Sequence, residues 1–257
     1  MEELSKLFFE LSNEDRLRIL KVLREGPTKL TPLSTTLDLT VQETSRHLAR
    51  MTKAELIQKE PSGAYSITAY GSQLQEVLPS FSFLIKNKDY FMSHTLSNLP
   101  KKFISRIGDL VNAELTDNAI VLFQHVDALI SRANEYVWIL SDQALSSTFP
   151  LLMESMERGV EFRVVLPADI GVPQIPEEKL PDFGKFREEL MQPRHLESVT
   201  HVVILSESEA ILALPDLDGR LDYIGFRFDN KAGHAYCYDL FLHFWDQGNP
   251  VVFDTRG

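Results

Sequence analysis

The stretch from Thr40 to Lys53, TVQETSRHLARMTK, is predicted to form one short helix, and the elements around it decide the fold of the first part of the chain. Thr40 suits the N-cap, and Glu43 three residues later completes a capping box. A packing face recurs at helical spacing: Val41, Thr44, Leu48 and Met51. A second stripe has no large apolar side chain: Gln42, Ser45, Arg46, Ala49, Arg50 and Lys53. By itself this pattern also fits an ordinary amphipathic surface helix.

The residues before this stretch predict three more helices. Leu4 to Leu11 has the apolar spacing of a helix, and Ser12 or Asn13 caps a second one that Gly26-Pro27 ends. Thr31-Pro32 opens a third helix, and Asp38-Leu39 forms a tight turn into Thr40. Two short helices joined by so short a turn are typical of a helix-turn-helix.

The residues after it predict a β-hairpin and a further helix. Leu56–Glu60 and Ala64–Ile67 alternate in character around the turn Pro61-Ser62-Gly63. Thr68 then caps a helix that we expect to end at Pro79. This order of helices, hairpin and helix is that of a winged helix.

A winged helix predicts which side chains would meet DNA. Arginine is the best bidentate partner of guanine, whereas lysines and the hairpin tip would contact phosphates or the minor groove. The predicted contacts are Gln42, Ser45, Arg46, Arg50, Lys53, Lys59 and Ser62. His47 flanks the stripe, and a structural role is the more frequent one for such a histidine.

Three runs of residues resemble the winged-helix domain of ArsR-type and related archaeal regulators. They are Ser45-Arg46-His47-Leu48, Ala54-Glu55-Leu56-Ile57 and Gly63-Ala64-Tyr65-Ser66-Ile67-Thr68. Glu55 departs from the glycine common after the recognition helix. The metal-sensing members use cysteine pairs near this helix, and the single cysteine here is Cys237, so metal sensing of that type is not supported.

Composition and charge favour two domains in a cytoplasmic protein. The chain has 257 residues and a net charge of −11. Residues 1–78 carry 10 basic and 11 acidic side chains, whereas residues 79–257 carry 16 and 26. The acidic surplus therefore lies outside the first domain, and we expect weak, salt-sensitive DNA binding per monomer. We expect no membrane segment and no signal peptide, and one cysteine suits a reducing compartment.

We expect residues 79–114 to form a helical connector between the domains. It is rich in apolar side chains, among them Phe81, Phe83, Tyr90 and Phe91. Packing onto a neighbouring domain and forming a dimer interface are equally consistent with that composition.

Residues 115–257 predict an α/β domain with a central mixed sheet. The expected helices are Asn118–Ala133, Ala144–Arg158 and Gly233–Trp245. The expected strands are Glu135–Ser141, Glu161–Leu166, Thr200–Leu205, Ala210–Leu214 and Tyr223–Phe228. Residues Asp169–Pro193 are expected to cross a sheet edge and could act as a lid.

This half resembles the effector domain of archaeal methanogenesis-type transcriptional regulators, whose sheet is phospholipase D-like in outline. The matching residues are Glu135–Ser141, Leu214–Gly219 with Asp222-Tyr223 and Gly225-Phe226, and Asp239-Leu240-Phe241 with Phe244-Trp245. Phospholipase D-like catalysis needs a histidine with a lysine two residues on and an aspartate five further. After His201 these positions hold Val203 and Ser208, so we expect no such activity and no enzyme.

A small effector would bind where strands end at their carboxyl side. Ser141-Asp142, Pro167-Ala168-Asp169 and Pro215-Asp216 are the candidate strand ends. The candidate ligand-binding residues are Asp142, Arg163, Asp169, His195 and Arg227. Nine aromatic side chains of this half are expected in its core rather than in a pocket: Tyr136, Trp138, Phe162, Tyr223, Phe226, Phe228, Tyr236, Phe241 and Trp245. We expect neither a metal site nor a cofactor.

The sequence thus favours a transcriptional regulator that binds an operator in double-stranded DNA as a homodimer, with a C-terminal domain that could be tuned by a small effector. The fold expected is α/β overall: an N-terminal α+β winged helix-turn-helix and a C-terminal α/β domain. Two alternatives stay open: a phospholipase D-like phosphodiesterase with a DNA-targeting module, and a winged-helix protein–protein adaptor.

Overall fold

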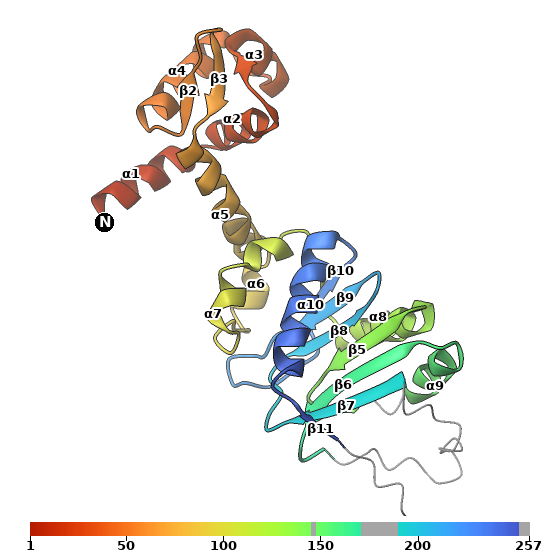
Figure 1. Cartoon of the computed structure of the whole chain (residues 1–257). Helices are drawn as coiled ribbons and strands as arrows, with labels where there is room; N and C mark the ends of the chain where they lie inside the picture. The colour runs from red at the N-terminus through yellow and green to blue at the C-terminus, as the bar shows by residue number, and fades with distance from the viewer. Residues whose placement is uncertain (145–147, 171–189, 252–257) are drawn as a thin grey trace, which may run out of the picture. The chain divides into compact units, whose positions relative to one another are not determined.

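The computed structural model describes residues 1–144, 148–170 and 190–251 of the chain. They separate into two compact units, Met1–Pro79 and Ser80–Gly257 (Figure 1). The fold is mixed α/β, with a winged helix-turn-helix in the first unit and a large mixed sheet in the second.

The first unit follows the order expected from its sequence. Its elements are α1 (Glu2–Leu11), α2 (Glu14–Glu25), β1 (Thr28–Lys29), α3 (Leu30–Leu37), α4 (Val41–Lys53), β2 (Ile57–Lys59), β3 (Ala64–Ile67) and the start of α5 (Ala69–Lys86). Asn13 caps α2 by accepting from the Arg16 amide at 3.1 Å. The strands form an antiparallel sheet in the order β1-β3-β2. One apolar core joins the helices to the hairpin, and Ile19, Leu33, Leu48 and Leu56 are fully buried in it.

Two helix limits differ from those expected. Helix α3 begins at Leu30, so Thr31 lies inside it, and the Thr31 carbonyl accepts from the Ser34 hydroxyl at 2.9 Å. Helix α5 does not end at Pro79 but continues to Lys86 with the proline inside. A proline in a helix costs about 3 kcal/mol or more. Packing on both sides of it offsets that cost, because Leu74 packs against the core of the first unit and Phe83 is fully buried in the second.

An eight-stranded sheet organises the second unit, in the order β11-β7-β6-β5-β8-β9-β10-β4. Strands β5 (Tyr136–Leu140), β6 (Glu161–Pro167) and β7 (Met191–Leu196) are parallel to one another. The other pairings, which involve β8 (Val202–Ser206), β9 (Ala210–Ala213), β10 (Gly225–Phe228), β4 (Glu114–Thr116) and β11 (Asn249–Pro250), are antiparallel. The mixed sheet expected from the sequence is confirmed.

Helices cover both faces of this sheet. Helix α10 (Lys231–Trp245) packs on one face, and α8 (Ala119–Arg132) and α9 (Phe149–Glu157) pack on the other (Figure 1). Eight of the nine aromatic side chains expected in the core are buried, and Tyr136 is half-buried.

The segment expected as a separate connector belongs to the second unit. Its short elements are α6 (Lys88–Phe91), α7 (Lys101–Ile104) and the 3-10 helix η1 (Ile107–Leu110). Phe83, Tyr90 and Phe103 are buried in the same apolar cluster as α10. Of the two roles considered for this segment, packing onto a neighbouring domain is therefore present.

Besides the short strand β1 of the first unit, three strands of the second unit were not expected from the sequence: β4, β7 and β11, which lie at or beside the sheet edges. Residues Met191–Pro193, counted in the sequence with an excursion over the sheet, are part of β7. The remainder of the lid expected there, residues 171–189, lies outside the described residues, as do residues 145–147 at the expected start of α9.

Candidate nucleic-acid interface

Helix α4 starts at the capping box predicted for it. The Glu43 amide donates to Thr40 Oγ1 at 3.1 Å, and the Thr40 amide donates to Glu43 Oε2 at 3.1 Å. The turn before it depends on Asp38, which has φ 56°, and the Leu39 amide donates to the Ser34 carbonyl at 3.0 Å. These local bonds fix where the helix begins and how it leaves α3.

The buried face of α4 is shifted by one position from that expected. Thr44, Leu48 and Met51 are buried as predicted, but Val41 is 50% exposed and His47 only 6% exposed. Val41 occupies the first helical position, before the helix reaches the core. His47 Nε2 lies 3.9 Å from Asp15 Oδ2. Because its side chain is packed inside, His47 is not part of the exposed polar stripe, and burial lowers the pKa of its imidazole.

The opposite face of α4 is open to solvent. Gln42, Ser45, Arg46 and Lys53 are exposed. In the described part of the chain, neither Arg46 nor Lys53 has a salt bridge. The structure therefore brings four of the predicted contact residues together on one polar, positively charged surface.

Arg50, the fifth residue predicted on this helix, is held by another helix. Its Nη2 donates to Glu10 Oε1 at 2.6 Å and its Nε to Glu10 Oε2 at 3.1 Å. Its guanidinium lies over the Phe9 ring, 5.0 Å from the centroid. These hydrogen bonds lower the pKa of the Glu10 carboxyl. Arg50 thus lies at the border of the stripe, against α1, and Glu10 is a site residue that the sequence did not reveal.

The hairpin β2–β3 presents the two remaining predicted residues. Lys59 is exposed and its Nζ lies 5.8 Å from the centroid of the Tyr65 ring. Ser62 Oγ accepts from the Ala64 amide at 3.2 Å, and Gly63 takes φ 82°, which shapes the tip. Ser62 therefore orders the turn, while its exposed position remains compatible with a phosphate contact.

Helix α4 ends without the glycine common there. Glu55 has φ 60°, the left-handed conformation that glycine favours. The Leu56 amide still donates to the Met51 carbonyl at 3.0 Å. The departure noted in the sequence thus preserves the turn.

The five ligand-binding candidates of the second unit do not converge on one site. Arg163 faces α10 and lies 4.5 Å over the Trp138 ring, whereas Arg227 Nε donates to Glu209 on the other face at 3.0 Å. Asp142 accepts from the Tyr223 hydroxyl. The remaining two candidates, Asp169 and His195, lie after β6 and on β7.

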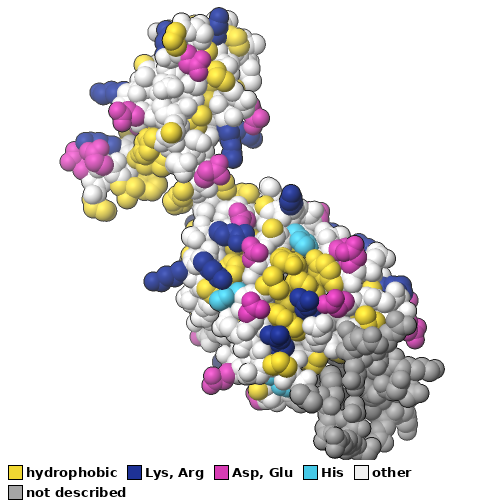
Figure 2. Space-filling model, viewed as in Figure 1, with side chains coloured by type: hydrophobic (Ala, Val, Ile, Leu, Met, Phe, Trp, Pro, Cys, Tyr) yellow, Lys and Arg dark blue, Asp and Glu magenta, His cyan; other side chains and the backbone are white. Residues whose placement is uncertain are grey.

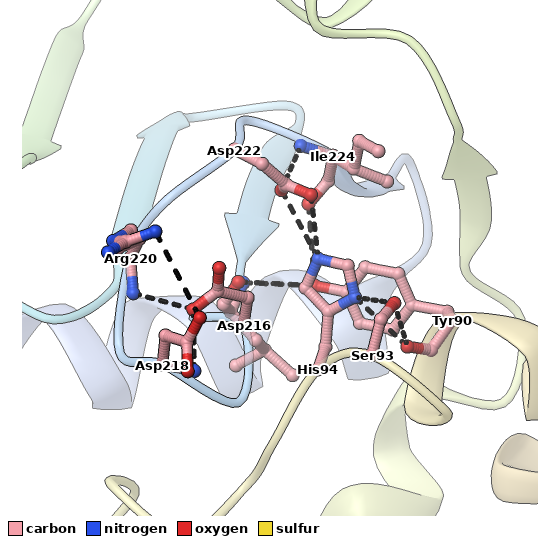
Figure 3. A network of polar contacts seen from close by, with 9 residues as sticks. Tyr90, Ser93, His94, Asp216, Asp218, Arg220, Asp222 and Ile224 are labelled. Atoms are coloured by element: carbon pink, nitrogen blue, oxygen red, sulfur yellow. Dashed lines mark hydrogen bonds and ion pairs between the residues drawn. The ribbon is translucent and has the colours of Figure 1, made fainter.

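The third candidate strand end, Pro215-Asp216, is occupied by a structural network (Figure 3). Asp216 Oδ1 accepts from the amides of Asp218 at 2.9 Å and Arg220 at 2.8 Å. His94 stacks on Tyr90, with centroids 3.8 Å apart, and its Nε2 lies 3.1 Å from Asp222 Oδ2. These contacts fasten the segment after α6 to the loop after β9.

The histidine tested for phospholipase D-like chemistry is inaccessible. His201 is 0% exposed, and burial lowers its pKa to about 4. Its Nδ1 lies 3.0 Å from the Thr200 hydroxyl, and its Nε2 has no hydrogen-bond partner among the described residues. A nucleophile must reach substrate, and this side chain does not.

One further surface feature lies in the second unit. A groove of about 420 Å³ lies beside α7 and α10 and is lined by Lys102, Phe103, Arg106, Asp239, Leu242, His243, Asp246 and Gln247. Across the ranges described above, no three His, Cys, Asp or Glu side chains gather as metal ligands. Nor does any helix there have the length and apolar character to cross a membrane.

Comparison with known proteins gives one family match, which lies in the first unit. No protein of curated function matches the chain. The structure of TrmBL2, an archaeal chromatin protein, is 15% identical with a TM-score of 0.44, over 93% of this chain and 94% of that chain. Nuc from Salmonella typhimurium, a phospholipase D family member, is 11% identical with a TM-score of 0.39, over 55% and 99%. NucT from Helicobacter pylori is 8% identical with a TM-score of 0.40, over 55% and 98%.

These structural likenesses are too distant to bear on function. A family model described as "Bacterial regulatory protein, arsR family" matches residues 13–59. The match spans α2, α3, α4 and β2, which contain most of the surface built above. Residues 13–59 are therefore similar to the helix-turn-helix domain of arsR-family regulatory proteins.

Proposed function

We propose that this chain is a sequence-specific, DNA-binding transcriptional regulator that acts as a homodimer. Helix α4 would enter the major groove of the operator, and the hairpin β2–β3 would contact the backbone beside it. The second unit would set the distance between two copies and could respond to a small molecule.

The observation that carries this proposal is the exposed face of α4. Gln42, Ser45 and Arg46 are exposed on a helix whose other side is fixed in the core. Arg46 has no salt bridge within the described residues, so its guanidinium is available for a base edge or a phosphate. The arsR-family match covers the same helix.

Exposed apolar side chains on α5 support the homodimer. In the first unit Tyr70 is 49% exposed and Val77 51%, seven residues apart on one side of the helix; in the second unit Ile85 is 75% exposed. A second copy would cover these side chains, and a two-fold pair of winged helices is suited to a palindromic operator. Replacing Ile85 with Glu should shift the protein from dimer to monomer in sedimentation analysis, and an unchanged mass would contradict this interface.

Support for an effector is confined to the architecture of the second unit. Its mixed sheet carries polar residues at strand ends, but Asp142 and Asp216 are occupied by internal hydrogen bonds. We propose no catalytic role for this unit, since His201 is buried and Val203 and Ser208 stand where phospholipase D-like chemistry needs lysine and aspartate.

The experiment is a fluorescence anisotropy titration of the full chain against the duplex upstream of its own gene, at several salt concentrations. We expect affinity to fall with salt, since each phosphate contact adds about 0.9 to the slope of log K against log salt. Arg46→Ala should cost about 1–3 kcal/mol and reduce the preference over an unrelated duplex.

Arg24→Ala is the matched control, because Arg24 is exposed on α2 and pairs with Glu76 at 2.8 Å, away from α4. It should change affinity little. Binding that is insensitive to salt, or equal effects of the two substitutions, would contradict the proposal and favour the adaptor alternative.

A further inference from the structure

Helix α1 supplies a carboxylate to the recognition surface. Glu10 is near the end of α1, and its two oxygens accept two hydrogen bonds from Arg50 on α4, at 2.6 and 3.1 Å. The Glu10 side chain is 17% exposed and that of Arg50 is 39% exposed. The contact joins residues 40 positions apart in the chain.

A second arginine stabilises this carboxylate from the other side. Arg16 is 6% exposed, its Nε lies 3.6 Å from Glu10 Oε2, and its Nη2 donates to the Phe9 carbonyl at 2.6 Å. Arg16 therefore anchors the end of α1 to α2. With two guanidinium groups for one carboxylate, the cluster keeps one net positive charge, and its exposed member is Arg50.

The guanidinium of Arg50 is fixed in orientation, but not all of its hydrogen-bond donors have a partner within the described residues. Its Cζ lies over the Phe9 ring, 5.0 Å from the centroid, and Glu10 accepts from Nε and Nη2. Its Nη1 makes no hydrogen bond within the described residues. A guanidinium ordered before binding loses less conformational entropy when it meets a phosphate or a base.

We infer that Glu10 and Phe9 are positioning residues that hold Arg50 for contact with DNA, so that α1 is a working part of the binding surface. This inference rests on the proposed DNA-binding function. It assigns a role to α1, which exposes apolar side chains to solvent (Figure 2) and has no fully buried residue.

The inference predicts that removing the Glu10 carboxylate changes DNA affinity in the direction opposite to that expected from charge alone. Removing a carboxylate near DNA should strengthen binding if charge alone matters. If Glu10 orders Arg50, Glu10→Gln should instead weaken binding by about two- to twelvefold, the cost of immobilising one long side chain. Glu76→Gln is the matched control, because it removes the carboxylate of an exposed arginine pair outside α4; it should leave binding unchanged or slightly tighter.

The test is the anisotropy titration of the full chain with the same duplex, combined with a double-mutant cycle. Arg50→Met should weaken binding and lower the salt slope by about one contact. Adding Glu10→Gln to Arg50→Met should then change affinity less than twofold. If Glu10→Gln disrupts folding by circular dichroism, Phe9→Leu tests the same point and should weaken binding about two- to fivefold.

Three results would overturn the inference. The first is that Glu10→Gln binds DNA as tightly as wild type or more tightly. The second is that Glu10→Gln weakens binding as much in the Arg50→Met background as in the wild-type chain. The third applies if Glu10→Gln does not fold: it is that Phe9→Leu binds DNA with wild-type affinity. A wild-type chain that does not bind DNA would instead remove the proposed function, and the inference with it. The two failures are therefore distinguishable.

Discussion

Gly71 lets the first turn of α5 pack closely against Leu56 and Ile67, at the ends of the β2–β3 hairpin, and Gly71→Ala should destabilise the first unit. A Cβ at this position would lie 2.1 Å from the Leu56 carbonyl oxygen and 2.9 Å from Ile67 Cγ1. Ordinary contacts of a Cβ begin at 3.4 Å. The Leu56 carbonyl also accepts from the Thr68 amide at 3.1 Å, so moving it would strain the cap of α5.

The expected magnitude follows from two opposing effects. Glycine to alanine inside a helix normally stabilises by about 1 kcal/mol. Overpacking usually costs about 1–3 kcal/mol, and a clash with main chain belongs at the upper end. We therefore expect a net loss of about 2 kcal/mol, which at an m-value of about 1 kcal/mol/M lowers the urea midpoint by about 2 M.

The two tryptophans allow the units to be followed separately. Trp138 and Trp245 both lie in the second unit, so their fluorescence reports its unfolding, whereas far-UV circular dichroism reports both. Gly71→Ala should lower the dichroism transition of the first unit and leave the tryptophan transition in place. Gln73→Ala, at an exposed position of the same helix, is the control. Unchanged or increased stability of Gly71→Ala would refute the argument from close packing.

Three further predictions concern other positions. The folded-state pKa of His201, about 4, lies below its unfolded value. The contribution of neutral His201 to the free energy of unfolding is therefore fully present above about pH 6.5 and is lost as the pH falls to about 4. At pH 5 the loss should be about 2 kcal/mol. His201→Leu should flatten this dependence in urea titrations followed by tryptophan fluorescence. Burial raises the pKa of the Cys237 thiol, so it should react with a thiol reagent only after denaturation. Glu55→Gly should stabilise the first unit by about 1 kcal/mol, measured by dichroism, because Glu55 has φ 60°.

Local signals were sufficient for much of the first unit. The capping box of Thr40 and Glu43, the turn at Asp38 and the hairpin around Gly63 each involve residues within a few positions of one another. Such bonds form wherever the local sequence permits them, so the start of α4 and the hairpin strands could be predicted. The exposed positions of Gln42, Ser45 and Arg46 followed from the helical period.

Long-range packing decided what the local sequence did not determine. The sequence contained no signal for the contact of Arg50 with Glu10, because a salt bridge across 40 positions depends on how two helices meet. Pro79 predicted a helix end, but burial of residues on either side carried α5 through it. Edge strands such as β4 and β11 have only two or three residues and form by pairing with distant strands.

The sequence by itself therefore determined helix α4, its polar face and the alternation of strands and helices after residue 115, since each depends on short-range periodicity and capping. Only the tertiary structure decided that α1 reaches α4, that His201 is sealed from solvent and that Arg163 and Arg227 lie on opposite faces of the sheet. The physical reason is common to all three: burial and charge pairing belong to surfaces that exist only when distant segments pack together.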